Sequence, residues 1–237
     1  MALGKHFPRV RLGTDLVAYY NLNVGFYTTG KVFDYSRKGH TGTVAGTSCL
    51  PKYPGFNFDG SKDYIDTDDS FQSTFQSDFS ISVWIKPDDG QPSHTEYVYG
   101  VDGFDINNRV YLGYTSQGQL TAGYSANTNG INKITVSLFQ NGQEDWHHIV
   151  VIVKSLNGVT LYIYLDGTYI TSGNHPSAVI GDYTSSQNLL IGNVATTGRD
   201  DNFFDGLIGE VMIYEKELTA TEIKGLYRQT KRFYTKE

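Results

Sequence analysis

The stretch FSISVWIKP at residues 79–87 constrains the fold of this chain most strongly, because its side chains alternate in character at every position. Successive side chains of a β-strand point to opposite faces of a sheet, so this alternation predicts a strand with one buried face. The apolar face comprises Phe79, Ile81, Val83 and Ile85, and the other face comprises Ser80, Ser82, Trp84 and Lys86. The stretch therefore predicts a sheet packed against a core.

Similar stretches recur along the chain, separated by turn signals at short intervals, as a β-sandwich requires. They cover residues 15–22, 56–67, 96–104, 109–115, 119–125, 133–139, 147–154, 159–170, 188–194 and 206–214. Asn157-Gly158 and Asp166-Gly167 supply the positive φ angles of tight hairpin turns. The irregular segments 24–57 and 127–146 are rich in Gly, Thr and Asn, and we expect loops there.

A helix is predicted to start at Thr219, because Glu222 follows three residues later and completes a capping box. Ile223, Leu226 and Tyr227 give a short apolar helical face, and Gly225 predicts that the helix is brief. The fold class is therefore all-β, a single antiparallel sandwich with a short C-terminal helix. The length of 237 residues suits one large domain of this class.

Charge is unevenly distributed over the chain. Residues 1–14 carry a net charge of +3 and residues 223–237 carry +4, which leaves −13 on the body between them. An acidic body argues against nucleic-acid binding. The basic ends predict docking onto an acidic neighbour, including another copy of the chain, with solubilising tails as the alternative.

Targeting and processing signals are absent from the sequence. Cys49 is the only cysteine, so no intramolecular disulfide forms. No signal peptide, no apolar stretch long enough for a membrane span and no N-x-[ST] sequon is visible. These features point away from a eukaryotic secreted glycoprotein, and they say less about a bacterial or viral origin.

An ordered series of motifs carries a family resemblance. The series runs LVAYYNL, FDYSRKGHTGTV, FNFDGSKDYI, FSISVWIKP, DWHHIVVIV, LYIYLDG, LLIGN and FDGLIGEVMIYEKELTATEI. In this order the motifs resemble laminin-G-like domains of the concanavalin A-like lectin/glucanase superfamily, and the C-terminal part also looks like pentraxins. The resemblance implies a jelly-roll sandwich of two curved antiparallel sheets over residues 15–227. Residues 1–14 are then a basic N-terminal arm and residues 228–237 a basic C-terminal tail.

The resemblance also implies a metal. Many relatives bind Ca²⁺ at the sheet rim through Asp side chains and carbonyl oxygens. Asp34, Asp59 and Asp205 occupy the corresponding motif positions, so we expect one structural Ca²⁺, with Asp-Gly turns that need no ion as the alternative. A double site of the pentraxin kind is not expected, because IGNVATTGRDD lacks the acidic cluster after the IG strand.

Glycan binding is the commonest role in the family that this chain resembles. Aromatic faces stack on sugar C–H surfaces, and polar loop residues hydrogen-bond the hydroxyl groups. The predicted contacts are Tyr97 and Tyr99, which share a face, together with Asn107, Asn108, Arg109 and Tyr111. The alternative is that a Tyr-rich sandwich exposes some Tyr on any outer sheet.

Catalysis finds little support in the sequence. The E-x-D-x-x-E run of β-glucan-cleaving relatives is absent, and Glu215 and Glu217 share one side only at a strand end. His147 and His148 point to opposite faces of a regular strand, which favours a structural role beside Trp146. Glu210 has no acidic partner on its own strand, so we interpret it as structural.

Three functions follow from these observations. The favoured one is a non-catalytic binding or adhesion module on the surface of a larger assembly, directed at a glycan or a cell-surface protein. The second is a structural virion protein, such as a capsid decoration or fibre component, and the third is a glycan-cleaving enzyme. The start at Met1 without a leader, the basic ends and the lack of disulfides favour a virion-surface or extracellular setting.

Overall fold

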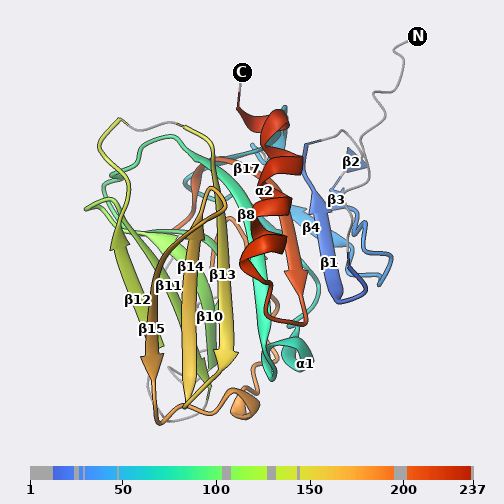
Figure 1. The fold of residues 1–237 in the computed structure, drawn as a ribbon. Coiled ribbons are helices and arrows are strands. Elements are labelled where there is room, and N and C mark those ends of the chain that lie inside the picture. The colour runs from blue at the N-terminus through green and yellow to red at the C-terminus, as the bar shows by residue number, and fades with distance from the viewer. Residues whose placement is uncertain are drawn as a thin grey trace.

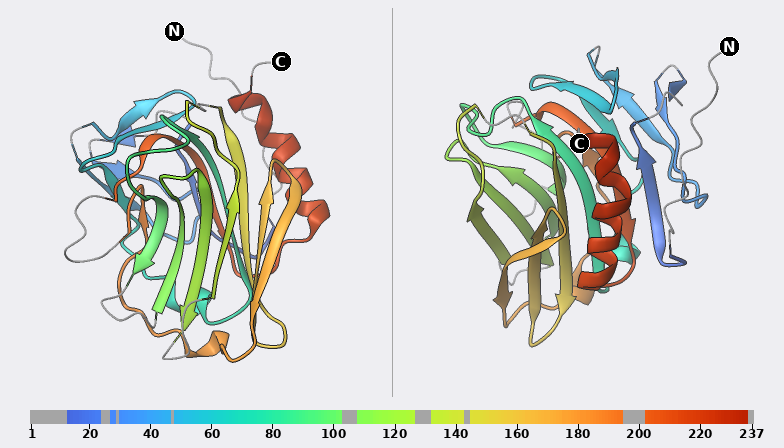
Figure 2. Two further views of the ribbon diagram at one scale, coloured as in Figure 1. Left: turned by 90° about the vertical axis from the view of Figure 1, so that its left-hand side faces the viewer. Right: turned by 45° about the horizontal axis from the view of Figure 1, so that its top comes forward.

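A computed structural model shows two curved β-sheets packed face to face, with one long helix on the outside (Figures 1 and 2). The structure describes residues 13–23, 27–28, 30–46, 48–102, 108–126, 132–142, 145–194 and 202–235. The two antiparallel sheets confirm the predicted sandwich. No helix in these ranges is long and apolar enough to cross a membrane.

Eight of the described strands form the sheet that carries the helix. In spatial order they are β15 (Thr168–His175), β14 (Val159–Leu165), β13 (His147–Ser155), β8 (Phe79–Pro87), β17 (Asp205–Tyr214), β6 (Gly55–Asp59) and β5 (Leu50–Lys52), with β1 (Leu16–Asn21) also paired to β17. The start of β17 pairs with β6 and its end pairs with β1, so these two strands follow one another along one side of β17.

Nine described strands form the second sheet. In order they are β12 (Asn132–Ser137), β11 (Gln119–Ala126), β10 (Asn108–Tyr114), β9 (Glu96–Asp102), β16 (Leu190–Ile191), β7 (Tyr64–Asp66), β4 (Gly42–Ala45), β3 (Lys31–Val32) and β2 (Tyr27–Thr28). Strands β2 to β5 fall in segment 24–57, which was expected to form loops. The expectation was wrong because these strands are short and depend on pairing with neighbours rather than on a local pattern.

The hydrophobic core lies between the two sheets and confirms the alternation in β8. Phe79, Ile81, Val83 and Ile85 are all buried in it. Trp84 points to the other face of the sheet, where it is buried under the helix. Two short helices, α1 (Gln72–Phe75) and η2 (Ile180–Asp182), contribute Phe75 and Ile180 to the core.

The C-terminal helix α2 (Ala220–Tyr234) is longer than the sequence suggested. The predicted capping box between Thr219 and Glu222 is present. Gly225 does not end the helix. Its cost in helix propensity is about 1 kcal/mol, and the free energy gained when later turns bury apolar side chains is larger. Residues 228–234 of the expected tail therefore belong to α2, and Tyr234 is buried.

Aromatic rings hold α2 against the sheet. The Trp84 ring stacks on the Tyr234 ring at 4.3 Å between centroids and on the Tyr227 ring at 5.8 Å. The indole N–H of Trp84 donates to the Thr230 hydroxyl at 2.8 Å. A second apolar cluster, which includes Ile223 and Leu226 of α2, continues this contact along the sheet.

A β-bulge in β17 changes which side chains share a face. In register with β8, Ile208 pairs with Ile85 and Val211 with Val83, so β17 has one extra residue between them. Ile208 therefore faces the core together with Val211, although strict alternation assigned them to opposite faces. Glu210 lies on the α2 side, beside Tyr234.

Candidate functional site

A small cavity opens on the outer face of the nine-stranded sheet, beside β7 and β16. Its volume is about 270 Å³. The lining residues are Tyr64, Asp66, Ser186, Gln187, Asn188 and Leu190. We call this cavity the β7–β16 pocket.

Strand alternation places the floor of the pocket. Ile65 points into the core, so Tyr64 and Asp66 on either side of it point outward. Asp66 is in register with Leu190 of β16, and Leu190 is in register with Gly100 of β9. The pocket thus joins strands that are far apart in the sequence.

Backbone contacts fix the segment that leads to the pocket wall. The Leu189 N–H donates to the Asp69 carbonyl at 2.8 Å, and the Thr67 N–H donates to the Leu189 carbonyl at 3.1 Å. The buried Thr67 hydroxyl also donates to the Leu189 carbonyl, at 2.8 Å. These bonds hold the end of the 186–188 wall beside β7.

The Asp66 carboxylate is held by the turn that follows β7. The Asp68 N–H donates to Asp66 Oδ1 at 2.8 Å, which closes an Asx-type turn. Asp68 adopts a left-handed conformation with a φ of 57°, which is uncommon for a residue other than Gly. This conformation keeps the turn tight and orients Asp66.

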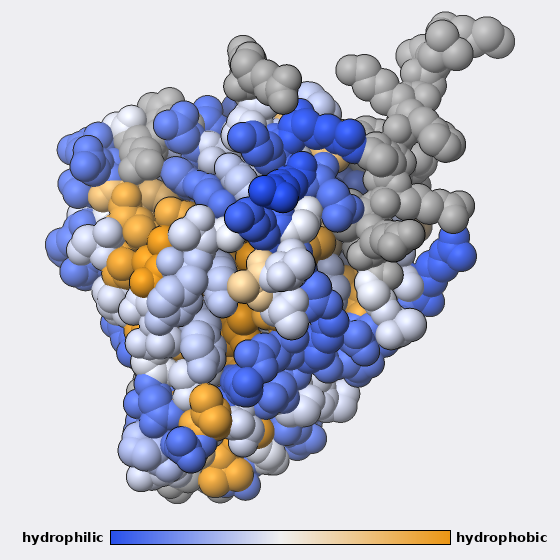
Figure 3. Space-filling model, in the orientation of Figure 1, coloured by the Kyte–Doolittle hydropathy of each residue, from blue (hydrophilic) through white to orange (hydrophobic). Residues whose placement is uncertain are grey.

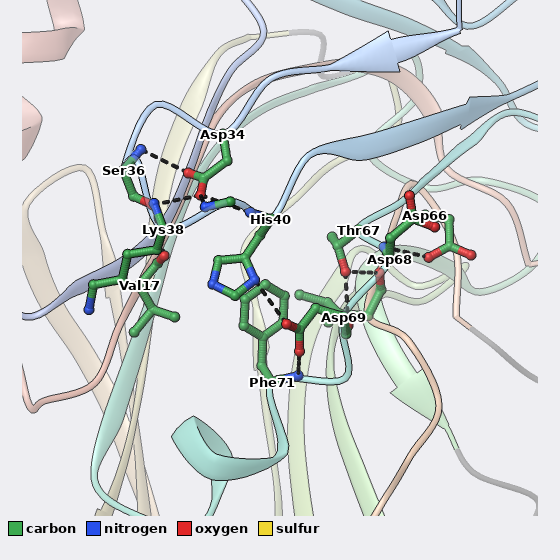
Figure 4. Close-up of polar contacts among 12 residues, drawn as sticks. Val17, Asp34, Ser36, Lys38, His40, Asp66, Thr67, Asp68, Asp69 and Phe71 are labelled. Atoms are coloured by element: carbon green, nitrogen blue, oxygen red, sulfur yellow. Dashed lines mark hydrogen bonds and ion pairs between the residues drawn. The ribbon is translucent and has the colours of Figure 1, made fainter.

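Carboxylates gather at this rim of the sheet (Figure 4). The Lys31 ammonium lies 3.5 Å from Asp68 Oδ2, and His40 Nδ1 lies 2.9 Å from Asp69 Oδ2. Asp69 Oδ1 also accepts the Phe71 N–H at 2.6 Å. Asp68 and Asp69 are therefore engaged with basic or donor groups.

The carboxylates of this rim act on the buried hydroxyl group of Tyr20. Burial raises the pKa of Tyr20 above its ordinary value, and the carboxylates of Asp34, Asp69, Asp68 and Asp66 raise it further. The carboxylates from Asp66 in the pocket wall to Asp34 in the loop after β3 therefore all lie near one buried hydroxyl group.

Sequence comparison identifies the family to which the chain belongs. The profile of the concanavalin A-like lectin/glucanases superfamily matches residues 59–224, which is well over half of the 237 residues. The chain belongs to this superfamily. The match includes strands from β7 to β17, and so both sides of the β7–β16 pocket. Among curated proteins, no match to the chain was found.

Solved structures with a similar fold are distant in sequence. A binding domain of botulinum neurotoxin DC in complex with SialylT is 16% identical, with a TM-score of 0.68 over 91% of this chain. The binding domain of botulinum neurotoxin DC in complex with rat synaptotagmin II is 16% identical, with a TM-score of 0.68 over 90% of this chain. The botulinum neurotoxin type G receptor binding domain is 15% identical, with a TM-score of 0.68 over 91% of this chain. The chain spans about half the length of these domains, 51% in each case. At this identity the likeness shows a shared lectin-like fold.

The predicted glycan contacts of this lectin/glucanase-superfamily chain do not form one exposed patch. Tyr97 and Tyr111 meet on the outer face of the sheet, with ring centroids 5.6 Å apart, but Tyr111 is only 7% exposed. Asn108 accepts a 2.8 Å hydrogen bond from the Thr184 N–H, and the half-buried Arg109 extends the same strand. Asn107 lies outside the described residues.

The assignment of Tyr99 to a binding surface was wrong. Its side chain is 1% exposed and belongs to the core. Leu112 of β10 pairs with Tyr99 and Gly113 with Tyr97, which leaves Val98 as an extra residue in β9. This bulge places Tyr97 and Tyr99 on opposite faces, and the sequence pattern gave no sign of it.

The three predicted calcium ligands do not form one site. Asp34 accepts hydrogen bonds from the N–H groups of Tyr19, Ser36, Gly39 and His40 (Figure 4). Burial by itself would raise the pKa of Asp34, but these bonds and the Ser36 hydroxyl outweigh it and lower the pKa. Asp34 thus caps its own loop and has little capacity left for a cation.

Asp59 and Asp205 do lie opposite one another, in register between β6 and β17. Burial raises the pKa of Asp205, and the carboxylates of Asp88 and Asp59 raise it further. Within the described residues, however, no three His, Cys, Asp or Glu side chains gather closely enough to hold a metal ion. A structural Ca²⁺ stays a prediction that would rest on this pair and on carbonyl oxygens.

The histidine pair has structural contacts on both sides of β13. His148 is buried, and its Nε2 lies 2.8 Å from the Ser82 hydroxyl. Its ring packs against Trp84, and burial lowers its pKa to about 4. His147 Nδ1 lies 3.0 Å from Asp166 Oδ2.

The pocket residues themselves were missed at the sequence level. The run Ser186-Gln187-Asn188 stands directly before the strand motif LLIGN, which marks it as a polar loop at a strand entrance. That signal identifies a loop, but its meeting with Tyr64 and Asp66 depends on the pairing of β16 with β7.

Proposed function

We propose that this chain is a non-catalytic glycan-binding module and that the β7–β16 pocket is its binding site. The observation that carries the proposal is the composition of the pocket wall: one tyrosine, one carboxylate, one hydroxyl and two carboxamides around a cavity of about 270 Å³. Pockets for drug-sized ligands usually measure about 300–1,000 Å³, so this cavity suits a single sugar ring.

The side chains match the groups of a sugar. Tyr64 offers an aromatic surface whose orientation is supported by Phe203, with ring centroids 6.4 Å apart. Asn188 and the exposed Ser186 and Gln187 offer both donors and acceptors for hydroxyl groups. A rigid sheet floor and a polar loop wall are a common arrangement for ligand recognition.

Hydrolysis of the bound sugar is not part of the proposal. Glycosidases normally use two carboxyl groups on either side of the bond that is cleaved, about 5–9.5 Å apart. Asp66 is the only carboxylate that lines the described pocket, and the neighbouring Asp69 is engaged by His40 and by the Phe71 N–H. The pocket therefore supports binding better than cleavage.

A glycan array tests this function. The wild-type protein should bind a defined set of glycans, and Asn188→Ala should weaken that binding at least about tenfold, since hydrogen bonds to a ligand would be lost. Asn141→Ala is a matched control, because Asn141 is exposed in a turn away from the pocket. An array without any glycan bound by the folded wild-type protein would contradict the proposal.

A second candidate, a structural component of a larger assembly, draws on the outer face of α2. Four exposed cations, Lys224, Arg228, Lys231 and Arg232, lie on this helix, which is hydrophilic along its upper part in Figure 3. None of them forms an ion pair with another described residue. We infer a role in contacting an acidic neighbour, which would place the module on a virion or cell surface.

Solution mass measurements test the assembly role. Light scattering should show concentration-dependent association of the wild-type protein, and the double variant Lys224→Glu, Arg228→Glu should abolish it, since both changes invert charge on the outer helix face. A monomer at all concentrations, with no binding to acidic partners, would rule out this role for α2 and leave the glycan proposal intact.

A further inference from the structure

The wall of the β7–β16 pocket carries a single charge. Asp66 is the only charged side chain among the six lining residues. It forms no ion pair with another described residue, and its Oδ1 accepts a hydrogen bond from the Asp68 N–H. Within the part of the chain that the structure describes, its negative charge therefore faces the cavity without a paired cation.

The basic groups of Lys31 and His40, which lie near Asp66, pair with other carboxylates. Lys31 lies 3.5 Å from Asp68 and also donates to Thr43, which occupies the next strand in register with Asp66. His40 is held by Asp69, and its ring packs 5.0 Å from the Phe71 ring, at the centroids. These contacts direct both basic groups to acids other than Asp66.

Other carboxylates lie close to Asp66, although each has its own partner. Asp68 and Asp69 follow it within three residues, and Asp34 faces His40 through the loop after β3 (Figure 4). An incoming carboxylate or sulfate would meet the charge of Asp66 at short range and be repelled by it. A neutral hydroxyl would instead donate a hydrogen bond to Asp66, and bonds to a charged acceptor are the stronger kind.

We propose that the pocket selects an uncharged sugar ring and excludes sialylated, sulfated and uronic acid sugars, with Asp66 as the residue that determines this choice. The inference rests on the proposed glycan-binding function and deepens it. Asp66 acts twice, as an acceptor for a sugar hydroxyl and as a barrier to anions.

The test compares glycans that differ in charge, and two of them differ only by one methyl group. The probes are a sialylated trisaccharide, the same trisaccharide with its carboxyl group converted to the methyl ester, and the neutral disaccharide. We expect the wild-type protein to bind the neutral disaccharide and the ester at least about tenfold more tightly than the free acid, with the difference shrinking at high salt because charge repulsion is screened.

Two variants complete the experiment. Asp66→Asn keeps the acceptor for the Asp68 N–H but removes the charge, so it should bind the free acid and the ester with equal affinity. Asp88→Asn removes an exposed carboxylate at the end of β8 and should leave the wild-type preference unchanged.

The outcomes separate the two proposals. Equal binding of acid and ester by the wild-type protein, or an Asp66→Asn variant that still rejects the acid, would overturn the charge selection and leave glycan binding in place. If Asp66→Asn fails to fold, the test is the salt dependence of the affinity of the wild-type protein for the free acid. An affinity for the free acid that does not change with salt overturns the inference. Binding of none of the probes, neutral or charged, would count against the proposed function itself.

Discussion

Glu210 shows how a single residue can carry a large electrostatic cost. It is 3% exposed, Oε1 accepts a 2.8 Å hydrogen bond from the Tyr19 hydroxyl, and its N–H donates to the Tyr234 hydroxyl at 2.8 Å. Oε2 has no hydrogen-bond partner in the part of the chain that the structure describes. Burial raises the pKa of Glu210 to about 7.

The raised pKa makes a prediction about stability and pH. A carboxyl group that binds its proton more tightly in the folded state contributes stability below its unfolded pKa of 4.5, and this contribution is lost as the pH rises through about 7. The shift corresponds to about 3 kcal/mol at 1.36 kcal/mol per pKa unit. We expect the free energy of unfolding of wild-type protein, relative to Glu210→Gln, to fall by about this amount between pH 4 and pH 8.

Urea titrations of both proteins across this pH range measure the difference. Glu96, whose pKa burial also raises to about 7, and His148 titrate in both proteins, so their effects cancel. Asn141→Ala is the control, because it changes no titratable group and should give a difference that does not change with pH. Parallel pH profiles for wild-type protein and Glu210→Gln would contradict the account.

The residue scale also shows where alternation rules fail. The pattern of β8 predicts both of its faces correctly, because β8 pairs without a register shift along β13. The same rule fails at Tyr99 and at Ile208, since each lies next to a bulge. A bulge depends on the pairing of two strands, so the sequence of one strand does not reveal it.

At the scale of elements, the sequence predicted the start of α2 but not its end. Its first residue follows from the capping box, a local signal between Thr219 and Glu222. Its end depends on Trp84, which lies far away in the sequence and provides the surface on which Tyr234 stacks. Local propensity favours an early stop at Gly225, and tertiary packing overrides it.

Truncation tests the role of this packing. Ending the chain after Gln229 removes Thr230 and Tyr234 and exposes Trp84. We expect a loss of about 2–4 kcal/mol in the free energy of unfolding, from the lost burial of an aromatic side chain and its stacking. Urea denaturation followed by tryptophan fluorescence measures it.

A chain that ends after Thr235 is the matched control, because it keeps every α2 contact described above. The urea concentration at the midpoint of its unfolding should equal that of the wild-type protein. If the chain that ends after Gln229 were equally stable, residues 230–234 would add nothing to the stability of the fold, which would contradict the account.

For the whole molecule, the sequence predicted the architecture but not the position of the pocket. Strand patterns, turn residues and the capping box are short-range signals, and together they require a sandwich with a terminal helix. The β7–β16 pocket instead arises from long-range pairing, which brings Leu190 into register with Asp66. The predicted patch around Arg109 followed from residue types alone, and one of its members, Tyr99, is in the core.

Mapping a bound sugar onto the protein tests the central claim most directly. The measurement is a titration of ¹⁵N-labelled protein with the neutral glycan that binds best on the array, followed by amide chemical shifts. We predict saturable shifts centred on Tyr64, Asp66 and residues 186–188, with the amides of Asn108 and Arg109 unchanged. Shifts centred on Arg109 or on the pair Asp59 and Asp205, with the β7–β16 pocket unaffected, would contradict the account.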